Sequence, residues 1–363
     1  MAPILTRVGQ SFGFGASTAG GGGGADPLEA SGGLISEYTD PTGKNYKTHI
    51  FTQDGTFEVT SGSASGEYVV IAGGGGGGSG YYGGGGGAGG LRTNMSGHPY
   101  NSPTNPACEL TITGGDGSGV YNITVGAGGR NGQHNNAQGP TYYPTDSAGN
   151  GTAENGGNSS LVVSPTVTVT SYGGGGGMGR QMGGGDTNGS PGGSGAGGAY
   201  GMPVAGYAFG PSANCPTSFM DPALAPTAPF TYQTGNPGGP APGNAPYGSG
   251  GGGAGSPGVT GGGPTNHGAD GGKGVPIAFA GGSFGGTPPT GDATDRWWFC
   301  GGGAGGGGGN PGNLKFRGGS ATGNPTTASN NTGDQPYSGG GDAGWDAYPQ
   351  KLGKPGWDTT GGG

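Results

Sequence analysis

The sequence has few of the residues on which most folded proteins depend. Leu, Ile, Val and Phe together account for 40 of its 363 residues, and only 9% of residues are charged. A single enzyme core of this length needs far more large apolar side chains. Cationic residues are scarce too, with 12 Lys and Arg against 20 Asp and Glu, which argues against nucleic-acid binding. We therefore expect neither an enzyme nor a nucleic-acid-binding protein.

Sequence signals for disulfides, export and membrane insertion are also missing. The three cysteines, Cys108, Cys215 and Cys300, lie too far apart for a disulfide framework or a zinc site, so we expect buried or unreactive thiols. The first residues lack the pattern of a secretory signal peptide. No stretch approaches the roughly 18 apolar residues of a membrane span. We expect a protein made in the cytoplasm without a signal peptide and without membrane insertion.

Motifs for catalysis and metal binding are not visible either. No P-loop motif occurs, and no Gly-x-Gly-x-x-Gly stands between a strand and an apolar helix. The four histidines, His49, His98, His134 and His267, are scattered without zinc spacing. Three acidic residues near the last tryptophans allow either a calcium site or a solvated acidic stretch, and we favour the second: Asp342, Asp346 and Asp358. We expect no cofactor and no metal.

Glycine dominates what is present, with 105 Gly and 30 Pro among the 363 residues. These two residues are the poorest helix formers, so no helical domain is expected. Collagen requires glycine at every third position, and long stretches of this chain lack that triplet. Such a composition is also typical of disordered chains, but the low charge and the 9% of aromatic residues argue against disorder.

Short strand patterns occur along the chain, and five of them stand directly before glycine runs: 67–72, 121–125, 167–172, 277–280 and 297–300. They alternate apolar and polar residues or consist of short apolar stretches, and they cover 49–52, 56–60, 67–72, 121–125, 167–172, 277–280 and 297–300. Gln53-Asp54-Gly55 between the first two predicts a β-hairpin. The junctions recur at unequal spacing, which excludes a solenoid of fixed period.

Three regions follow from these patterns. Residues 1–46 read as an extended N-terminal arm that gains order on a partner. Residues 47–172 form a strand-rich glycine domain. Residues 173–363 form a glycine body interrupted by a Pro-rich excursion at 202–247.

The glycine runs themselves predict an unusual packing. Ordering glycine costs more backbone entropy than ordering any other residue, and glycine has no side chain to compensate. Extended chains with three residues per turn point their N–H and C=O groups outward and can pair with neighbours packed closely on every side. We predict an all-β or irregular fold without significant helix, built from short antiparallel strands and packed polyglycine-II helices. The run Gly73–Gly90 should turn near Tyr81-Tyr82 and form two such helices; the alternative is a plain glycine linker.

Recognition must come from residues other than glycine. Exposed aromatic residues in loops are good contact residues, so we predict receptor or subunit contacts at Tyr81, Tyr82, His98, Tyr100, Tyr142, Tyr143, Trp345 and Tyr348. For Trp297, Trp298 and Phe299 we favour a place in the core over exposure.

Residues 48–345 resemble the glycine-rich domain of tailed-bacteriophage structural and tail-fibre proteins. The resemblance rests on the expected hairpin Phe51…Gly55-Thr56-Phe57, on Ile123-Thr124-Val125-Gly126 and on an expected turn at Asn158-Ser159-Ser160, with glycine runs after the strands. Later matches are WWFCGGGAGGGGG and SNNTGDQPYSGGGDAG. In the family's adhesins, polyglycine-II helices form a sandwich whose connecting loops touch the bacterial surface. This chain differs by its short arm 1–46 and by the excursion 202–247.

The resemblance implies a non-enzymatic virion protein, foremost a tail-fibre-associated adhesin. Its expected partners are other virion proteins and a bacterial surface glycan or outer-membrane protein, and a homo-oligomer is compatible with the sequence. The arm would attach to the particle, with Phe12 and Phe14 as contacts. Three alternatives stay open: a capsid or baseplate decoration subunit without receptor binding, an ice-binding protein, and an enzyme that trims surface polysaccharide.

Overall fold

The described part of the chain contains β-strands as its only regular secondary structure. The computed structural model describes residues 2–6, 28–39, 45–78, 83–94, 110–113, 119–132, 153–164, 167–179, 189–199, 235–240, 247–261, 268–277, 297–306, 340 and 361–363. Their strand pairings are antiparallel. The prediction of an all-β, irregular fold without helix is confirmed for these residues.

The first sheet has six strands. Its order is β3 (Leu34–Thr39), β4 (Asn45–Phe51), β1 (Ala2–Thr6), β6 (Ser63–Ile71) and β7 (Leu91–Thr93), with β8 (Leu110–Thr113) also paired to β6. The strand β6 is nine residues long and pairs with three neighbours along its length. It is the central strand that leads into the first glycine run.

The second sheet has five strands, and a third sheet has two. The order of the second is β11 (Val167–Ser171), β10 (Ser159–Ser164), β9 (Val120–Thr124), β5 (Gly55–Ser61) and β2 (Glu29–Ser31). The small sheet pairs β12 (Val275–Ile277) with β13 (Trp297–Phe299).

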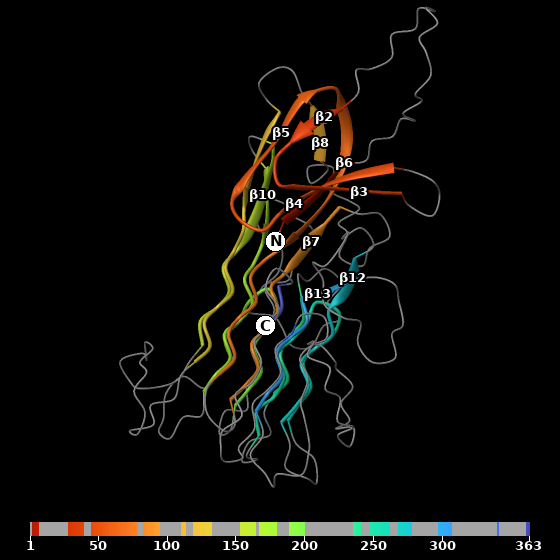
Figure 1. Ribbon diagram of the computed structural model, residues 1–363. Coiled ribbons are helices and arrows are strands. Elements are labelled where there is room, and N and C mark those ends of the chain that lie inside the picture. The colour runs from red at the N-terminus through yellow and green to blue at the C-terminus, as the bar shows by residue number, and fades with distance from the viewer. Residues whose placement is uncertain are drawn as a thin grey trace, which may run out of the picture.

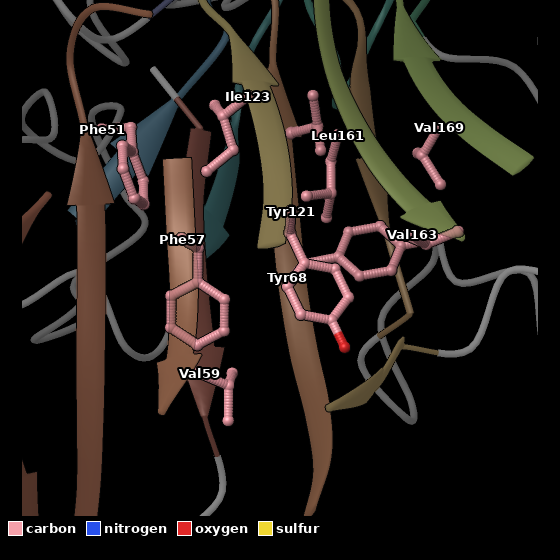
Figure 2. Close-up of a cluster of buried hydrophobic side chains, with 10 residues drawn as sticks. Phe51, Phe57, Val59, Tyr68, Tyr121, Ile123, Leu161, Val163 and Val169 are labelled. Carbon is pink, nitrogen blue, oxygen red and sulfur yellow. The ribbon is translucent and has the colours of Figure 1, made fainter. Parts of the chain in front are cut away.

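An apolar core lies between the two larger sheets (Figure 2). Alternate residues of β5 and β9 are buried, as expected for strands with one face inward. The largest buried members are Phe57 and Tyr68, at 0% and 2% exposure. The remaining buried members are Phe51, Val59, Val70, Tyr121, Ile123, Leu161, Val163 and Val169.

A second core lies on the other face of β6. Tyr68 and Val70 belong to the first core, whereas Val69 and Ile71 belong to the second, because successive residues of a strand point to opposite faces. The other members join the small sheet to the start of the glycine segments: Ile50, Ala88, Leu91, Ala254, Val275, Ile277, Phe299 and Cys300. Trp298 is also buried, at 7% exposure, so the core placement of Trp298 and Phe299 is confirmed.

The glycine segments run side by side away from the sheets (Figure 1). We call them together the glycine array, made of residues 73–78, 83–90, 126–132, 153–157, 173–179, 192–199, 235–240, 248–255, 258–261, 268–274, 301–306 and 361–363. Segments 73–78 and 83–90 are hydrogen-bonded to each other in antiparallel directions, with Gly78 N to Gly84 O at 2.9 Å and Gly75 N to Gly87 O at 2.8 Å. The predicted division of the run Gly73–Gly90 into two segments is therefore confirmed.

Two predictions about local structure are wrong. The strands at 49–52 and 56–60 exist but do not form a hairpin, because β4 belongs to the first sheet and β5 to the second. The Asp54 carboxylate accepts a hydrogen bond from the Val125 N–H at 2.8 Å at this crossing between sheets. Ser159 and Ser160, expected in a turn, begin β10.

The predicted N-terminal arm is also partly wrong. Its residues 2–6, 29–31 and 34–39 are strands that pair within the chain, β1 with β4 and β6, β2 with β5, and β3 with β4. Backbone pairing with the chain's own sheets therefore takes the place of the expected partner. Of the excursion at 202–247, residues 235–240 and Tyr247 are described, and 235–240 belongs to the glycine array; the rest lies outside the described residues.

Candidate functional site

Hydrogen bonds within the glycine array repeat every three residues. The N–H groups of Gly84, Gly87 and Gly90 donate to the carbonyls of Met178, Gly175 and Tyr172 at 2.8–2.9 Å. The carbonyls of the same three glycines accept from the N–H groups of Gly78, Gly75 and Ala72 at 2.8–3.1 Å. Residues three apart therefore point to the same neighbour, as in an extended helix with three residues per turn.

The other residues of segment 83–90 point to other neighbours. The N–H groups of Gly85 and Ala88 donate to segment 248–255, and their carbonyls accept from segment 192–199. The carbonyls of Gly83 and Gly86 accept from segment 301–306, and Gly89 donates to Gly361. Segment 83–90 is thus hydrogen-bonded to six neighbours, two for each of the three residues in a turn.

The packing leaves no room for side chains at many positions. A Cβ atom placed on Gly86 would lie 2.8 Å from the Gly75 carbonyl carbon, and one placed on Gly251 would lie 2.9 Å from the Gly87 nitrogen. Both distances are shorter than an ordinary contact of about 3.5–4.0 Å. Glycine is therefore required here by close approach of neighbouring backbones, independently of any positive φ angle.

Asparagine side chains continue the three-residue period at the rim of the array. The Asn155 and Asn158 carboxamide oxygens accept from the N–H groups of Gly176 and Gly173 at 2.7 and 2.9 Å. The Asn131 oxygen accepts from Gly77 N at 2.9 Å. These side chains accept hydrogen bonds from glycine N–H groups in place of a backbone carbonyl. They thereby fix which residues of two adjacent segments lie opposite each other.

One side of the array is exposed. Segments 126–132 and 153–157 include the exposed residues Ala127, Gly128 and Asn155. Arg130 and Glu154 form an exposed ion pair with Nε to Oε2 at 3.8 Å, of a kind that contributes little to stability. A Cβ atom on Gly128 would meet nothing closer than 3.9 Å. Glycine is therefore not required by packing at position 128, whereas a Cβ atom on Gly129 would lie 2.8 Å from the Glu154 carbonyl carbon.

The order of segments and strands defines two ends of the array. Segment 73–78 leaves β6, and segment 83–90 returns to β7; likewise 126–132 leaves β9, and 153–157 returns to β10. Gly78, Gly83, Gly132 and Ala153 therefore lie at the end of the array opposite the sheets, which we call the far end (Figure 1).

The aromatic residues predicted to make contacts all lie outside the described residues, as do Phe12 and Phe14. Their flanking segments are described for several of them. Tyr81 and Tyr82 fall between Gly78 and Gly83, and Tyr142 and Tyr143 fall between Gly132 and Ala153, so both pairs belong to connections that leave the far end. His98 and Tyr100 fall between β7 and β8 in the sequence. Trp345 and Tyr348 fall between Gly340 and Gly361.

Four titratable side chains are buried near the junction of sheets and array. Desolvation lowers the pKa of His49, against a hydrogen bond from its Nδ1 to the Gly32 carbonyl at 2.8 Å. The His49 ring packs edge-on against Phe57, and its Nε2 has no hydrogen-bond partner among the described residues. Burial raises the pKa of Tyr68 and of the Cys300 thiol to about 12 and lowers that of Arg92. These shifts come from burial and not from groups arranged for catalysis.

Sequence reasoning missed the structural role of Cys300. Its φ angle is 61°, in the left-handed region that non-glycine residues rarely adopt. It is fully buried where β13 passes into the glycine segment 301–306. The immediate junction of an apolar strand with a glycine run was the available signal that a sharp change of backbone direction occurs here.

Comparison with known proteins gives no match. No protein-family model matches the chain, and neither curated proteins nor solved structures show significant similarity to it. In the described residues no three or more His, Cys, Asp or Glu side chains are grouped so that they could hold a metal ion. Those residues also include no long apolar helix of the kind that crosses a membrane.

Proposed function

We propose that this chain is a structural protein of a bacteriophage particle, and that it serves as a tail-fibre-associated adhesin contacting the bacterial surface. The observation that carries the proposal is the three-residue hydrogen-bond period of the glycine array, in which segment 83–90 has six hydrogen-bonded neighbours. We interpret these segments as polyglycine-II helices. The resemblance of residues 48–345 to the glycine-rich domain of phage tail proteins supports the same interpretation.

The array suits a scaffold better than an active site. Its interior consists mainly of backbone, and the polar side chains buried in its described residues are Ser194 and Ser249, which gives little for acid–base or nucleophilic catalysis. Its backbone amides are paired with several neighbours at once, which resists bending in every direction. A rigid body of this kind can present connecting residues at a fixed place, and binding residues are commonly held on connections between rigid elements.

The far end is the proposed receptor-binding end. The connections that contain Tyr81, Tyr82, Tyr142 and Tyr143 leave the array there. Two tyrosine pairs on connections from one end are well suited to a bacterial surface glycan or to an outer-membrane protein, because tyrosine buries a large area at low entropic cost. The sheets at the other end would then face the particle.

A second candidate is a capsid or baseplate subunit without receptor binding. Its support is the strand β3, at the edge of the first sheet. Leu34 and Ile35 on this strand are 56% and 52% exposed. An edge strand with exposed apolar side chains is suited to contact with another subunit.

Adsorption of phage particles to host cells tests the two candidates. The double variant Tyr81→Ala with Tyr82→Ala should reduce adsorption at unchanged incorporation into particles, as should Tyr142→Ala with Tyr143→Ala. The control is a double variant at two exposed positions of β5 in the sheets, Thr56→Ala with Glu58→Ala. Unchanged adsorption in both far-end variants would favour the subunit role. Absence of the chain from purified particles, measured by mass spectrometry, would contradict both.

A further inference from the structure

The segment Gly361–Gly363 occupies a slot between residues from two distant parts of the chain. One wall of the slot consists of residues 71–74 and 86–89, which connect to β6 and β7. The other wall consists of residues 300–303, which follow β13. More than 200 residues of sequence separate the two walls, and the three glycines lie between them.

Hydrogen bonds tie the segment to both walls. Gly89 N–H donates to the Gly361 carbonyl at 2.9 Å, and Gly363 N–H donates to the Gly301 carbonyl at 3.0 Å. Gly89 and Gly301 are buried, so removal of the segment would leave a donor and an acceptor without partners. Leaving a buried backbone group unpaired is unfavourable, so the slot is more stable with the segment in place.

The slot accepts glycine and excludes larger residues. A Cβ atom on Gly361 would lie 2.5 Å from Ile71 Cγ2 and 2.9 Å from the Ala72 oxygen. The φ angle of Gly361 is 67°, which also favours glycine. A Cβ atom on Gly363 would lie 2.6 Å from the Gly87 oxygen. Side-chain and backbone atoms around Gly361, and backbone atoms around Gly363, therefore leave no room for a residue larger than glycine at these two positions.

The walls are shaped for this occupant as well. A Cβ atom on Gly74 would lie 2.8 Å from the Gly363 nitrogen, and one on Gly303 would lie 2.9 Å from the Gly363 oxygen. Glycines on the walls therefore allow the segment to approach closely enough for its hydrogen bonds.

We propose that the slot formed by residues 71–74, 86–89 and 300–303 is a peptide-binding site selective for an extended oligoglycine segment. Residues 361–363 are the ligand that it holds within the same chain. The segment lies between residues 86–89 and residues 300–303 of the chain, and its hydrogen bonds to Gly89 and Gly301 connect these two parts. This assignment rests on contacts of the described residues and does not depend on a role in a phage particle.

The test uses a variant that lacks residues 361–363 and is otherwise unchanged. We expect the Gly89 amide to exchange its hydrogen at least about tenfold faster in this variant, because it loses its acceptor. The probe is a fluorescent, C-terminally amidated peptide with the sequence of residues 358–363, Asp-Thr-Thr-Gly-Gly-Gly. It should bind the truncated chain, restore the slow exchange of Gly89, and fail to bind the full chain, whose slot is filled.

The control peptide has alanine in place of the first of its three glycines. If the alanine peptide binds the truncated chain as tightly as the glycine peptide does, the proposed selectivity for glycine is wrong. If the glycine peptide binds the full chain as tightly as the truncated chain, residues 361–363 do not occupy the proposed binding site. Unchanged exchange at Gly89 after truncation would also overturn it.

A full-chain variant guards against a truncated chain that does not fold. Gly361→Ala should also accelerate exchange at Gly89, whereas Gly77→Ala, with open space around its new Cβ, should not. Equal exchange rates at Gly89 in these two variants would contradict the proposal, whatever the truncated chain does.

Discussion

Two glycines of one run should respond in opposite ways to the same substitution. A Cβ atom on Gly75 would lie 2.5 Å from the Gly175 carbonyl carbon and 2.8 Å from the Gly174 oxygen, whereas one on Gly77 would meet nothing closer than 3.9 Å. Neither glycine has a positive φ angle. Gly75→Ala and Gly77→Ala therefore differ in the space that the new methyl group finds, within the same segment 73–78.

Three effects decide the expected magnitude. Alanine in place of glycine restricts the unfolded chain and stabilises the folded state by about 0.4–1 kcal/mol where the methyl group fits. A methyl group in a filled position costs about 1–3 kcal/mol. Displacing Gly175 also disturbs the bond from Gly87 N–H to the Gly175 oxygen, 2.8 Å long and worth about 1 kcal/mol. We expect Gly75→Ala to be about 2–4 kcal/mol less stable than Gly77→Ala.

Urea unfolding followed by tryptophan fluorescence measures this difference. Gly77→Ala should unfold at the wild-type urea concentration or slightly above it, and Gly75→Ala clearly below it. Hydrogen exchange provides a local measurement, because Gly75→Ala should accelerate exchange at the Gly87 amide. Equal midpoints for the two variants would refute the reasoning, since the segments would then not be packed at the distances described.

Three further predictions concern the buried side chains. Burial lowers the pKa of His49 in the folded state, so its neutral form is favoured there. The free energy of unfolding should therefore be at its full value above the unfolded pKa of 6.5 and fall as the pH drops below it. Urea midpoints at pH 7 and pH 5 should differ less in His49→Asn than in the wild type. The thiol of Cys300, with its pKa raised to about 12 by burial, should resist iodoacetamide at pH 8 until the chain unfolds, as peptide mass mapping can show. Phe57→Ala should cost about 3–5 kcal/mol of unfolding free energy, whereas Glu58→Ala at the exposed neighbouring position should change it by less than about 0.5 kcal/mol; similar urea midpoints for these two variants would contradict the described core.

The strands next to glycine runs could be predicted because their signal is local. Alternation in β5 and β9, and the apolar end of β6, identify strands without reference to the rest of the chain. The hairpin at Asp54-Gly55 was wrong because a local turn signal does not say which strands pair. Phe51 and Phe57 lie on either side of this turn, and crossing between sheets lets both reach the same core.

The strands near the N-terminus could not be predicted for a related reason. The five residues of β1 pair with β4, more than 40 residues away, and three of them also pair with β6, at least 60 residues away. Nothing in Ala2–Thr6 itself indicates these partners. A short segment followed by glycine-rich sequence therefore resembled an arm, although non-local backbone pairing places it in the middle of a sheet.

The arrangement of the glycine array shows the limit of sequence reasoning most clearly. One glycine run cannot be told from another by its composition, so the sequence predicts close packing without naming the neighbours. Residues outside the runs help to specify the neighbours. Strands fix where several segments begin or end, and Asn131, Asn155 and Asn158 fix residues opposite each other through side-chain hydrogen bonds. Gly361–Gly363, far from any predicted strand, had no such signal.

The balance between backbone and apolar burial predicts an unusual heat capacity of unfolding. Exposure of apolar surface raises the heat capacity and exposure of polar surface lowers it, with a usual sum of about 12–15 cal/mol/K per residue. Here 105 of the 363 residues are glycine, and unfolding of the array exposes mainly peptide groups. We expect a value per residue clearly below the usual range, measured by scanning calorimetry over several pH values. A value within that range would mean that apolar burial, and not backbone pairing, dominates the folded state.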